Sequence, residues 1–277
     1  MRISTEGEDY KFYPMNIVKL TGQSDFMLLG TYYDVESRVA KDASLGLASW
    51  RFNTAGKVVA KKYNSWEGPI GKYLPADAKG RVSDVGYIYF HKVLQTEDGK
   101  FFAVGEGYKK VVSGFGVAAG ILGGIGGGGS GVSMMKLKIT DLILMQFDEQ
   151  FDIKNAKIYE KNSNSVEMPA GASYLTPHTM ALMAKSYKAF DYDFTQTDKN
   201  HTRFSVGYSD YVKDDDFKGR TFNTISYMDG KITTDKINIA SNKATWMRLM
   251  SAKPGFIVVM EYFKKDKKLD IRLEKLN

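Results

Sequence analysis

The sequence contains no cysteine, and this absence excludes several kinds of site at once. Disulfides, thiolate metal ligands and a cysteine nucleophile are all ruled out. The compartment stays open, because cysteine-free chains occur both in the cytosol and among exported proteins that rely on a large core.

Histidine is almost as scarce, with three residues at positions 91, 178 and 201. They are far apart and show neither His-x-x-x-His nor His-Glu-x-x-His spacing, so we predict structural roles for them and no metal site. The sequence also lacks a convincing Gly-x-Ser-x-Gly elbow and a Gly-Lys-Ser/Thr phosphate loop. We therefore predict no cofactor, and a catalytic function is disfavoured.

Charge of one sign is not concentrated in any segment. Lys and Arg outnumber Asp and Glu by 39 to 32, a net charge of +7, but the signs are interspersed. The densest basic stretch, residues 264–268, is interrupted by Asp266, which indicates a solvated hairpin. No nucleic-acid partner is expected. Weak binding to anionic polymers is an alternative, and it predicts affinity that collapses with salt.

The N-terminal residues lack the apolar run of a signal peptide. We therefore expect a cytoplasmic protein if the chain begins at Met1, and a periplasmic or extracellular one if a leader precedes it. Nothing in the sequence indicates an oligomeric state.

Aromatic residues are abundant, at 13%, and favour strands. A short phrase, an aromatic or apolar run followed by a small residue and Tyr, returns four times. The copies are residues 26–33, 101–108, 204–208 and 256–263, and Met260 replaces the glycine in the last. Such self-similarity is the signature of repeat architectures.

The surroundings of the phrase define a repeating unit. A strand-like segment and a turn signal such as Asp98-Gly99 precede it, and two further strand-like segments follow. We predict an all-β fold, a β-propeller-like array of about four four-stranded antiparallel units in a single domain, residues 1–277. The last unit has no fourth strand, for which Met1–Thr5 is a candidate. Copy spacings of 75, 103 and 52 residues require long insertions, and the chain is either a closed array or a fragment of a larger propeller.

This order of turn, apolar run, Gly and Tyr resembles an uncharacterised group of Bacteroidota proteins with divergent propeller-like repeats. The resemblance implies a propeller fold, export from the cytoplasm and no assigned activity.

Residues 111–135 form the most unusual segment, without a charge and with ten glycines in positions 114–131. So much glycine disfavours a helix, so we predict a Gly-rich insertion loop and no stable membrane span. Partner or lipid contact and membrane insertion are the alternatives. Residues 175–187 instead show helical spacing, with Pro177 at a permissible early position, and predict a short helix.

Five residues are candidate ligand contacts. Trp66 lies in a loop-like segment and could stack on a sugar or a protein, although packing is an equal alternative. Two acidic clusters could bind a ligand or a hard cation, although solvated loops are the simpler interpretation. The candidates are Trp66, Asp191, Asp193, Asp214 and Asp216.

The leading hypothesis for function is a non-catalytic binding or scaffold protein that presents propeller loops to a protein or glycan partner. The rival is a carbohydrate-active hydrolase with carboxylates from different blades. Two carboxylates about 5 to 9.5 Å apart in a central pocket would favour the hydrolase.

Overall fold

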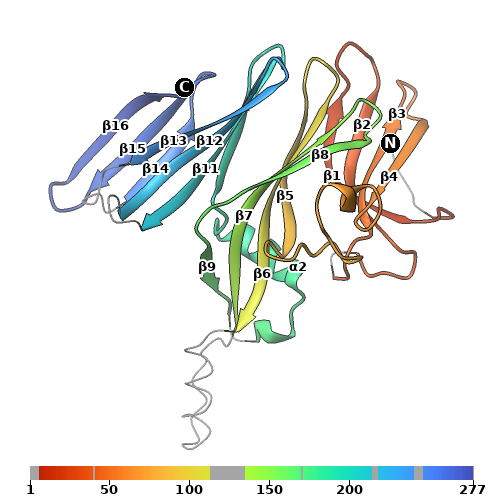
Figure 1. The fold of residues 1–277 in the computed structure, drawn as a ribbon, viewed down its shortest axis with the longest axis horizontal. Helices are drawn as coiled ribbons and strands as arrows, with labels where there is room; N and C mark the ends of the chain where they lie inside the picture. The colour runs from red at the N-terminus through yellow and green to blue at the C-terminus, as the bar shows by residue number, and fades with distance from the viewer. Residues whose placement is uncertain are drawn as a thin grey trace, which may run out of the picture. The chain divides into compact units, whose positions relative to one another are not determined.

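The computed structural model describes residues 6–39, 41–112, 135–169, 171–213, 218–239 and 246–276. The chain divides into two compact units, Met1–Gln95 with Gly99–Phe190 and Thr96–Asp98 with Asp191–Asn277. Each unit contains two antiparallel sheets, so the described chain is nearly all-β and fits a propeller-like array, as predicted (Figure 1). The single domain over residues 1–277 stays a prediction.

The first unit contains sheets of four and five strands. The first sheet has the order β1(Lys11–Lys19), β2(Phe26–Tyr33), β3(Gly46–Phe52), β4(Val58–Ser65). The second has the order β5(Tyr87–Gln95), β6(Phe101–Val112), β7(Met135–Phe147), β8(Ile153–Tyr159), and β9(Asn164–Glu167) pairs with β7. The short helices are η1(Ile70–Lys72), η2(Ala172–Tyr174) and α2(Pro177–Ser186). Most of the predicted Gly-rich loop 111–135 lies outside the described residues.

The second unit contains sheets of four and three strands. The four-stranded sheet has the order β10(Tyr192–Thr197), β11(Arg203–Lys213), β12(Lys218–Met228), β13(Lys231–Ile239). The last sheet has the order β14(Trp246–Ser251), β15(Phe256–Phe263), β16(Lys268–Lys275). The last repeat was predicted to have three strands of its own, as this sheet does. The candidate for its fourth strand, residues 1–5, lies outside the described residues.

The repeated phrase lies on the second strand of every sheet, β2, β6, β11 and β15, which confirms the predicted unit. Close packing explains its glycine. A Cβ on Gly30 would lie 2.0 Å from the carbonyl oxygen of Tyr13, and one on Gly207 would lie 2.6 Å from Cζ of Phe222. A larger residue at Gly30 requires the backbone of the neighbouring strand to move, and one at Gly207 requires the ring of Phe222 to move.

The first strand of a sheet carries a one-residue bulge wherever the phrase keeps its glycine. The bulged residues are Met15, His91 and Asp193, each beside the partner of Gly30, Gly105 or Gly207. In the last sheet Met260 pairs in regular register with Arg248, and the β14–β15 ladder has no bulge. Glycine and bulge therefore occur together in these sheets.

Apolar clusters hold each unit together. In the first unit, Met27 and Leu29 of one sheet pack with Phe101 and Ile143 of the other. On helix α2, Met180, Ala181 and Ala184 pack against β6 and β7. The predicted helix is thus confirmed, with Thr176 as its N-cap, and its methionine serves packing. In the second unit Phe222 packs with Ile257 and Val259.

Candidate functional site

A cavity of about 340 Å³ lies in the first unit, bounded by strands of both sheets and by helix α2. Aromatic rings form much of its wall, and they are those of Tyr13, Tyr33, Trp66, Tyr87, Tyr89, Phe90 and Tyr108. Polar side chains also face it, from Thr31, Lys41, Asp42, Ser44, Lys79, His91 and His178. Size and lining match small-ligand sites, which are mostly apolar with a few placed polar groups.

Trp66 is fixed at this wall by its own contacts. It follows β4 directly and is only 4% exposed. Its Nε1 donates to the carbonyl oxygen of Ser44 at 3.0 Å, and its ring stacks on Phe90 with centroids 6.4 Å apart. Gly80, at φ +74°, passes so close that a Cβ would lie 2.6 Å from the indole. The indole is therefore held in place before any ligand arrives.

His91 is the bulged residue of β5 and lines the cavity. Before the bulge, Ile88 and Phe90 pack on the core between the sheets, while Tyr89 packs toward the cluster around α2. After it, Val93 resumes the core side. His91 lies two residues after Tyr89 and on the same side of the strand, with ring centroids 5.2 Å apart, and the bulge returns Val93 to the core side. Bulges are common near functional sites.

His91 belongs to a buried network of charged side chains. The side chains of Glu106, Lys161 and His91 are fully buried. Glu106 Oε1 lies 3.2 Å from Nζ of Lys161, and Glu106 Oε2 lies 3.2 Å from Nε2 of His91. A buried carboxylate is tolerated only with such partners, because its desolvation is otherwise uncompensated.

The network assigns the protonation state of His91. A carboxylate only accepts, so the Nε2–H group donates to Glu106, and Nδ1 accepts from Nζ of Lys185 at 3.3 Å. Burial lowers the pKa of His91, while Glu106 opposes the shift. Burial also lowers the pKa of Lys185. His91 is therefore a neutral, oriented imidazole at pH 7.

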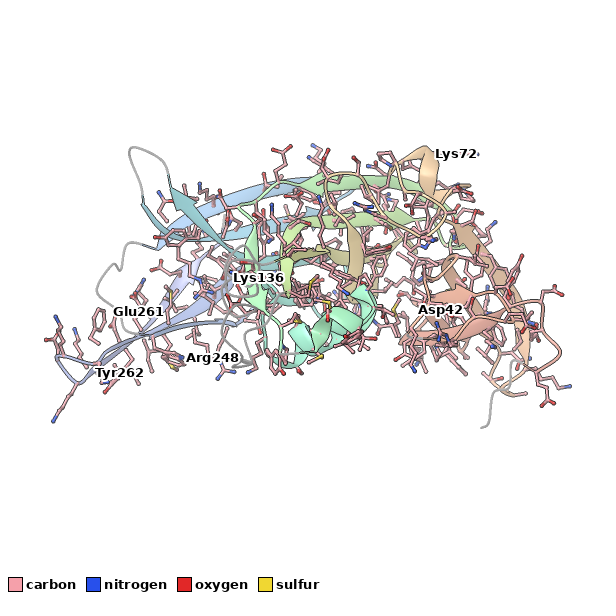
Figure 2. All side chains as sticks on the ribbon, turned by 90° about the horizontal axis from the view of Figure 1, so that it is seen from below. Asp42, Lys72, Lys136, Arg248, Glu261 and Tyr262 are labelled. Carbon is pink, nitrogen blue, oxygen red and sulfur yellow. The ribbon has the colours of Figure 1, made fainter. Side chains whose placement is uncertain are left out.

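The charged residues of the cavity lining differ in whether they already have an ion-pair partner. Asp42, labelled in Figure 2, is hydrogen-bonded to Arg38, which lowers the pKa of Asp42 to about 2. Lys41 and Lys79 are exposed, and neither ammonium group has an ion-pair partner among the described residues. The carboxylate is thus already neutralised, whereas two cations remain available to a ligand.

The structure places the predicted site residues in different settings. Trp66 lines the cavity. Asp191 and Asp193 belong to the second unit, where Asp193 is the bulged residue of β10 and accepts a hydrogen bond from Ser209 at 2.8 Å. Their segment was interpreted as a loop, but Tyr192–Thr197 is a strand. Asp214 and Asp216 lie outside the described residues. Their ligand-binding roles stay predictions.

No group of three His, Asp or Glu side chains within the described ranges could hold a metal ion. The helices of the same ranges include none that is long and apolar enough to cross a membrane.

Sequence reasoning missed Glu106 and Lys161 as site residues and treated His91 as structural. One signal was present for Glu106, because it is a single charge inside the apolar run Phe101–Tyr108. A lone carboxylate in a buried strand needs a buried partner. The identity of the partner was not readable, because Lys161 lies 55 residues away in the chain.

Comparison with protein families shows that the chain belongs to the family of unknown function DUF6770, whose model matches residues 1–277. This confirms the expected membership of a group without assigned activity. The expected Bacteroidota origin stays a prediction. No curated protein matches the sequence.

Several solved structures are distantly similar. A protein of unknown function from Dyadobacter fermentans is 8% identical over 97% of this chain and 66% of its own, with a TM-score of 0.43. An apocarotenoid oxygenase variant from Synechocystis is 9% identical over 96% of this chain and 50% of its own, with a TM-score of 0.34. An endo-arabinase from Bacteroides thetaiotaomicron is 7% identical over 97% of this chain and 93% of its own, with a TM-score of 0.22. The chain thus spans two thirds or less of the first two, and likenesses this weak do not bear on function.

Proposed function

We propose that the protein is a non-catalytic binding protein and that its first unit takes a small ligand, one or two sugar residues of a glycan, in the aromatic cavity. The observation that carries the proposal is the lining, in which fixed aromatic rings alternate with hydroxyl and imidazole groups. Aromatic faces pack against the C–H faces of sugars, while polar groups meet their hydroxyls. The volume suits a ligand of that size and is too small for a folded partner.

A glycan is favoured over a protein partner by the position of the aromatic rings. Tyr33, Trp66 and Tyr108 are buried in the wall, so a flat protein surface would not reach them. A sugar ring at a chain end enters a cavity without reshaping it. Preorganised rings such as Trp66 limit the entropy lost on binding.

The hydrolase alternative requires two carboxylates that face the same ligand. Among the described residues that line the cavity, Asp42 is the single carboxylate, and Arg38 holds it ionised, so it cannot act as a general acid. No specific observation in this cavity favours hydrolysis.

The test is calorimetric titration with a panel of mono- and disaccharides. Tyr13 and Leu182 line the cavity and are each 40% exposed, so both can be changed without removing core packing. We expect Tyr13→Ala to weaken binding about tenfold through loss of an aromatic contact. Leu182→Trp is expected to abolish binding because the larger side chain fills part of the cavity.

Tyr174→Ala is the matched control, because Tyr174 is exposed and does not line the cavity. It should bind as the natural sequence does. The proposal fails if no sugar of the panel binds, or if binding persists in Leu182→Trp. Release of reducing sugar during incubation with oligosaccharides would replace it with the hydrolase.

A further inference from the structure

The last sheet has an apolar outer face. Along β16, Leu269, Ile271 and Leu273 are 50%, 56% and 53% exposed and lie on one side of the strand. The ladder aligns them with Tyr262, Met260 and Val258 of β15. Figure 2 shows Tyr262 and Arg248 on one side of this sheet and Glu261 on the other. Exposed apolar patches of this kind mark interaction sites.

Strand β16 is also an edge. The sheet has the order β14-β15-β16, so within the described chain no strand pairs with the outer side of β16. The other three sheets each continue to a fourth strand. An edge strand presents unpaired N–H and C=O groups that can accept another chain.

The sequence of β16 is complementary to itself when it is reversed. Residues 268–274 read Lys-Leu-Asp-Ile-Arg-Leu-Glu. In an antiparallel pair centred on Ile271, Lys268 lies opposite Glu274, and Asp270 lies opposite Arg272. On the other face Leu269 meets Leu273, and Ile271 meets its own copy. Charges thus pair with opposite charges and apolar side chains with apolar ones.

The neighbouring registers are disfavoured. A shift of two residues places Asp270 opposite its own copy, or Arg272 opposite its own copy, and like charges across a pair destabilise it. A shift of one residue turns the apolar row toward the charged face. Charges on an edge strand normally oppose pairing, but here their order permits one register and rejects the adjacent ones.

The acidic surroundings of Arg272 point the same way. This guanidinium contacts Glu261, Asp270 and Glu274, so three carboxylates share one cation within the chain. Oε1 of Glu261 is buried without a hydrogen-bond partner in the described structure. In the proposed register Arg272 of a second copy lies opposite Asp270, and its Lys268 lies opposite Glu274, so each of these two carboxylates gains a facing cation.

We propose that β16 is a homodimerisation strand, and that two copies of the chain pair through it antiparallel about a two-fold axis at Ile271. The pair gives each last sheet its fourth strand. Such an interface is isologous, as is usual for homodimers. It is independent of the cavity and of the ligand proposed for it.

The absence of cysteine makes the axis directly testable. Ile271→Cys introduces a single thiol, and two residues facing each other across an antiparallel pair are within disulfide reach. We expect a reductant-sensitive covalent dimer under mild oxidation at about 10 µM. Ile17→Cys, at an exposed position of strand β1, is the matched control and should stay monomeric on a denaturing gel.

Charge exchange tests the register in solution by sedimentation velocity. The natural sequence should sediment at twice the mass of one chain. Lys268→Glu or Glu274→Lys alone creates two like-charge pairs per dimer and should weaken association about tenfold. The double variant Lys268→Glu/Glu274→Lys restores opposite charges and should restore the dimer. The proposal is overturned if the natural sequence is monomeric at about 100 µM, or if the double variant associates no more tightly than the single variants.

Discussion

Glu106 supplies the sharpest test of the first unit's interior. The substitution Glu106→Gln keeps the size of the side chain but removes the charge that faces Lys161 at 3.2 Å. Both side chains are fully buried, so the substitution removes a carboxylate from beside a buried ammonium group. Breaking a buried ion pair from one side costs about 3 to 5 kcal/mol. Since whole domains are stable by about 5 to 15 kcal/mol, this loss is large.

The assay is urea unfolding followed by tryptophan fluorescence in a Trp246→Phe background. Trp50 and Trp66, the remaining tryptophans, both belong to the first unit, so the signal reports on that unit alone. Lys62→Ala is the control, because Lys62 and Asp152 form a half-exposed ion pair in the same unit. Such pairs contribute about 1 kcal/mol or less.

A second variant separates charge burial from general disruption. Glu106→Gln/Lys161→Met removes both charges and leaves an amide oxygen to accept from His91. Replacing a buried ion pair by neutral groups is often close to neutral, so the double variant should recover most of the stability lost in Glu106→Gln. The reasoning would be refuted if Glu106→Gln lost no more free energy of unfolding than Lys62→Ala. It would also be refuted if Glu106→Gln/Lys161→Met were less stable than Glu106→Gln.

His91, Gly207 and Lys79 each give a further prediction. Because the pKa of His91 in the fold lies below its unfolded value, unfolding binds a proton below about pH 6.5. Stability should therefore fall below that pH, with His91 contributing at most about 1.4 kcal/mol per pH unit, and the slope measured by urea unfolding at several pH values should be smaller in His91→Gln. Gly207→Ala should cost about 1 to 3 kcal/mol in urea unfolding, since its Cβ would meet Phe222 at 2.6 Å, whereas the exposed Thr233→Ala should cost little. Lys79→Ala should weaken the binding of an acidic sugar a few-fold more than that of its neutral analogue at low salt. Equal losses of affinity for the two sugars would contradict an electrostatic role.

Local patterns were sufficient to predict most of the secondary structure. The turn before each phrase, and the turn inside the strand pair that follows it where one does, are short connections, and these leave readable turn residues such as Asp98-Gly99. Helix α2 was predictable for the same reason, because Thr176 and Pro177 are start signals close to the residues that they affect. Strand β10 was missed because its polar residues, Asp193 above all, resemble a solvated loop.

The cavity could not be predicted, because it is assembled from contacts distant in sequence. His91, Glu106, Lys161 and Lys185 are spread over 95 positions, from 91 to 185, and no spacing rule connects them. Trp66 was chosen for its loop-like neighbours, yet its place in the wall depends on Ser44 and Gly80. Packing between sheets decides such neighbours, and one sequence does not display it.

The glycine of the repeated phrase nevertheless gives a rule that connects the repeat with chemistry. Where it is present, the facing strand is bulged, and the bulged residue is Met15, His91 or Asp193. Two of these three line the aromatic cavity. The third is a residue that the sequence had already suggested as a ligand contact. A bulged residue has no partner in the ladder, so its side chain can be changed with little effect on strand pairing. Where Met260 replaces the glycine, the bulge is absent, and the distinctive feature of that sheet is the edge formed by β16.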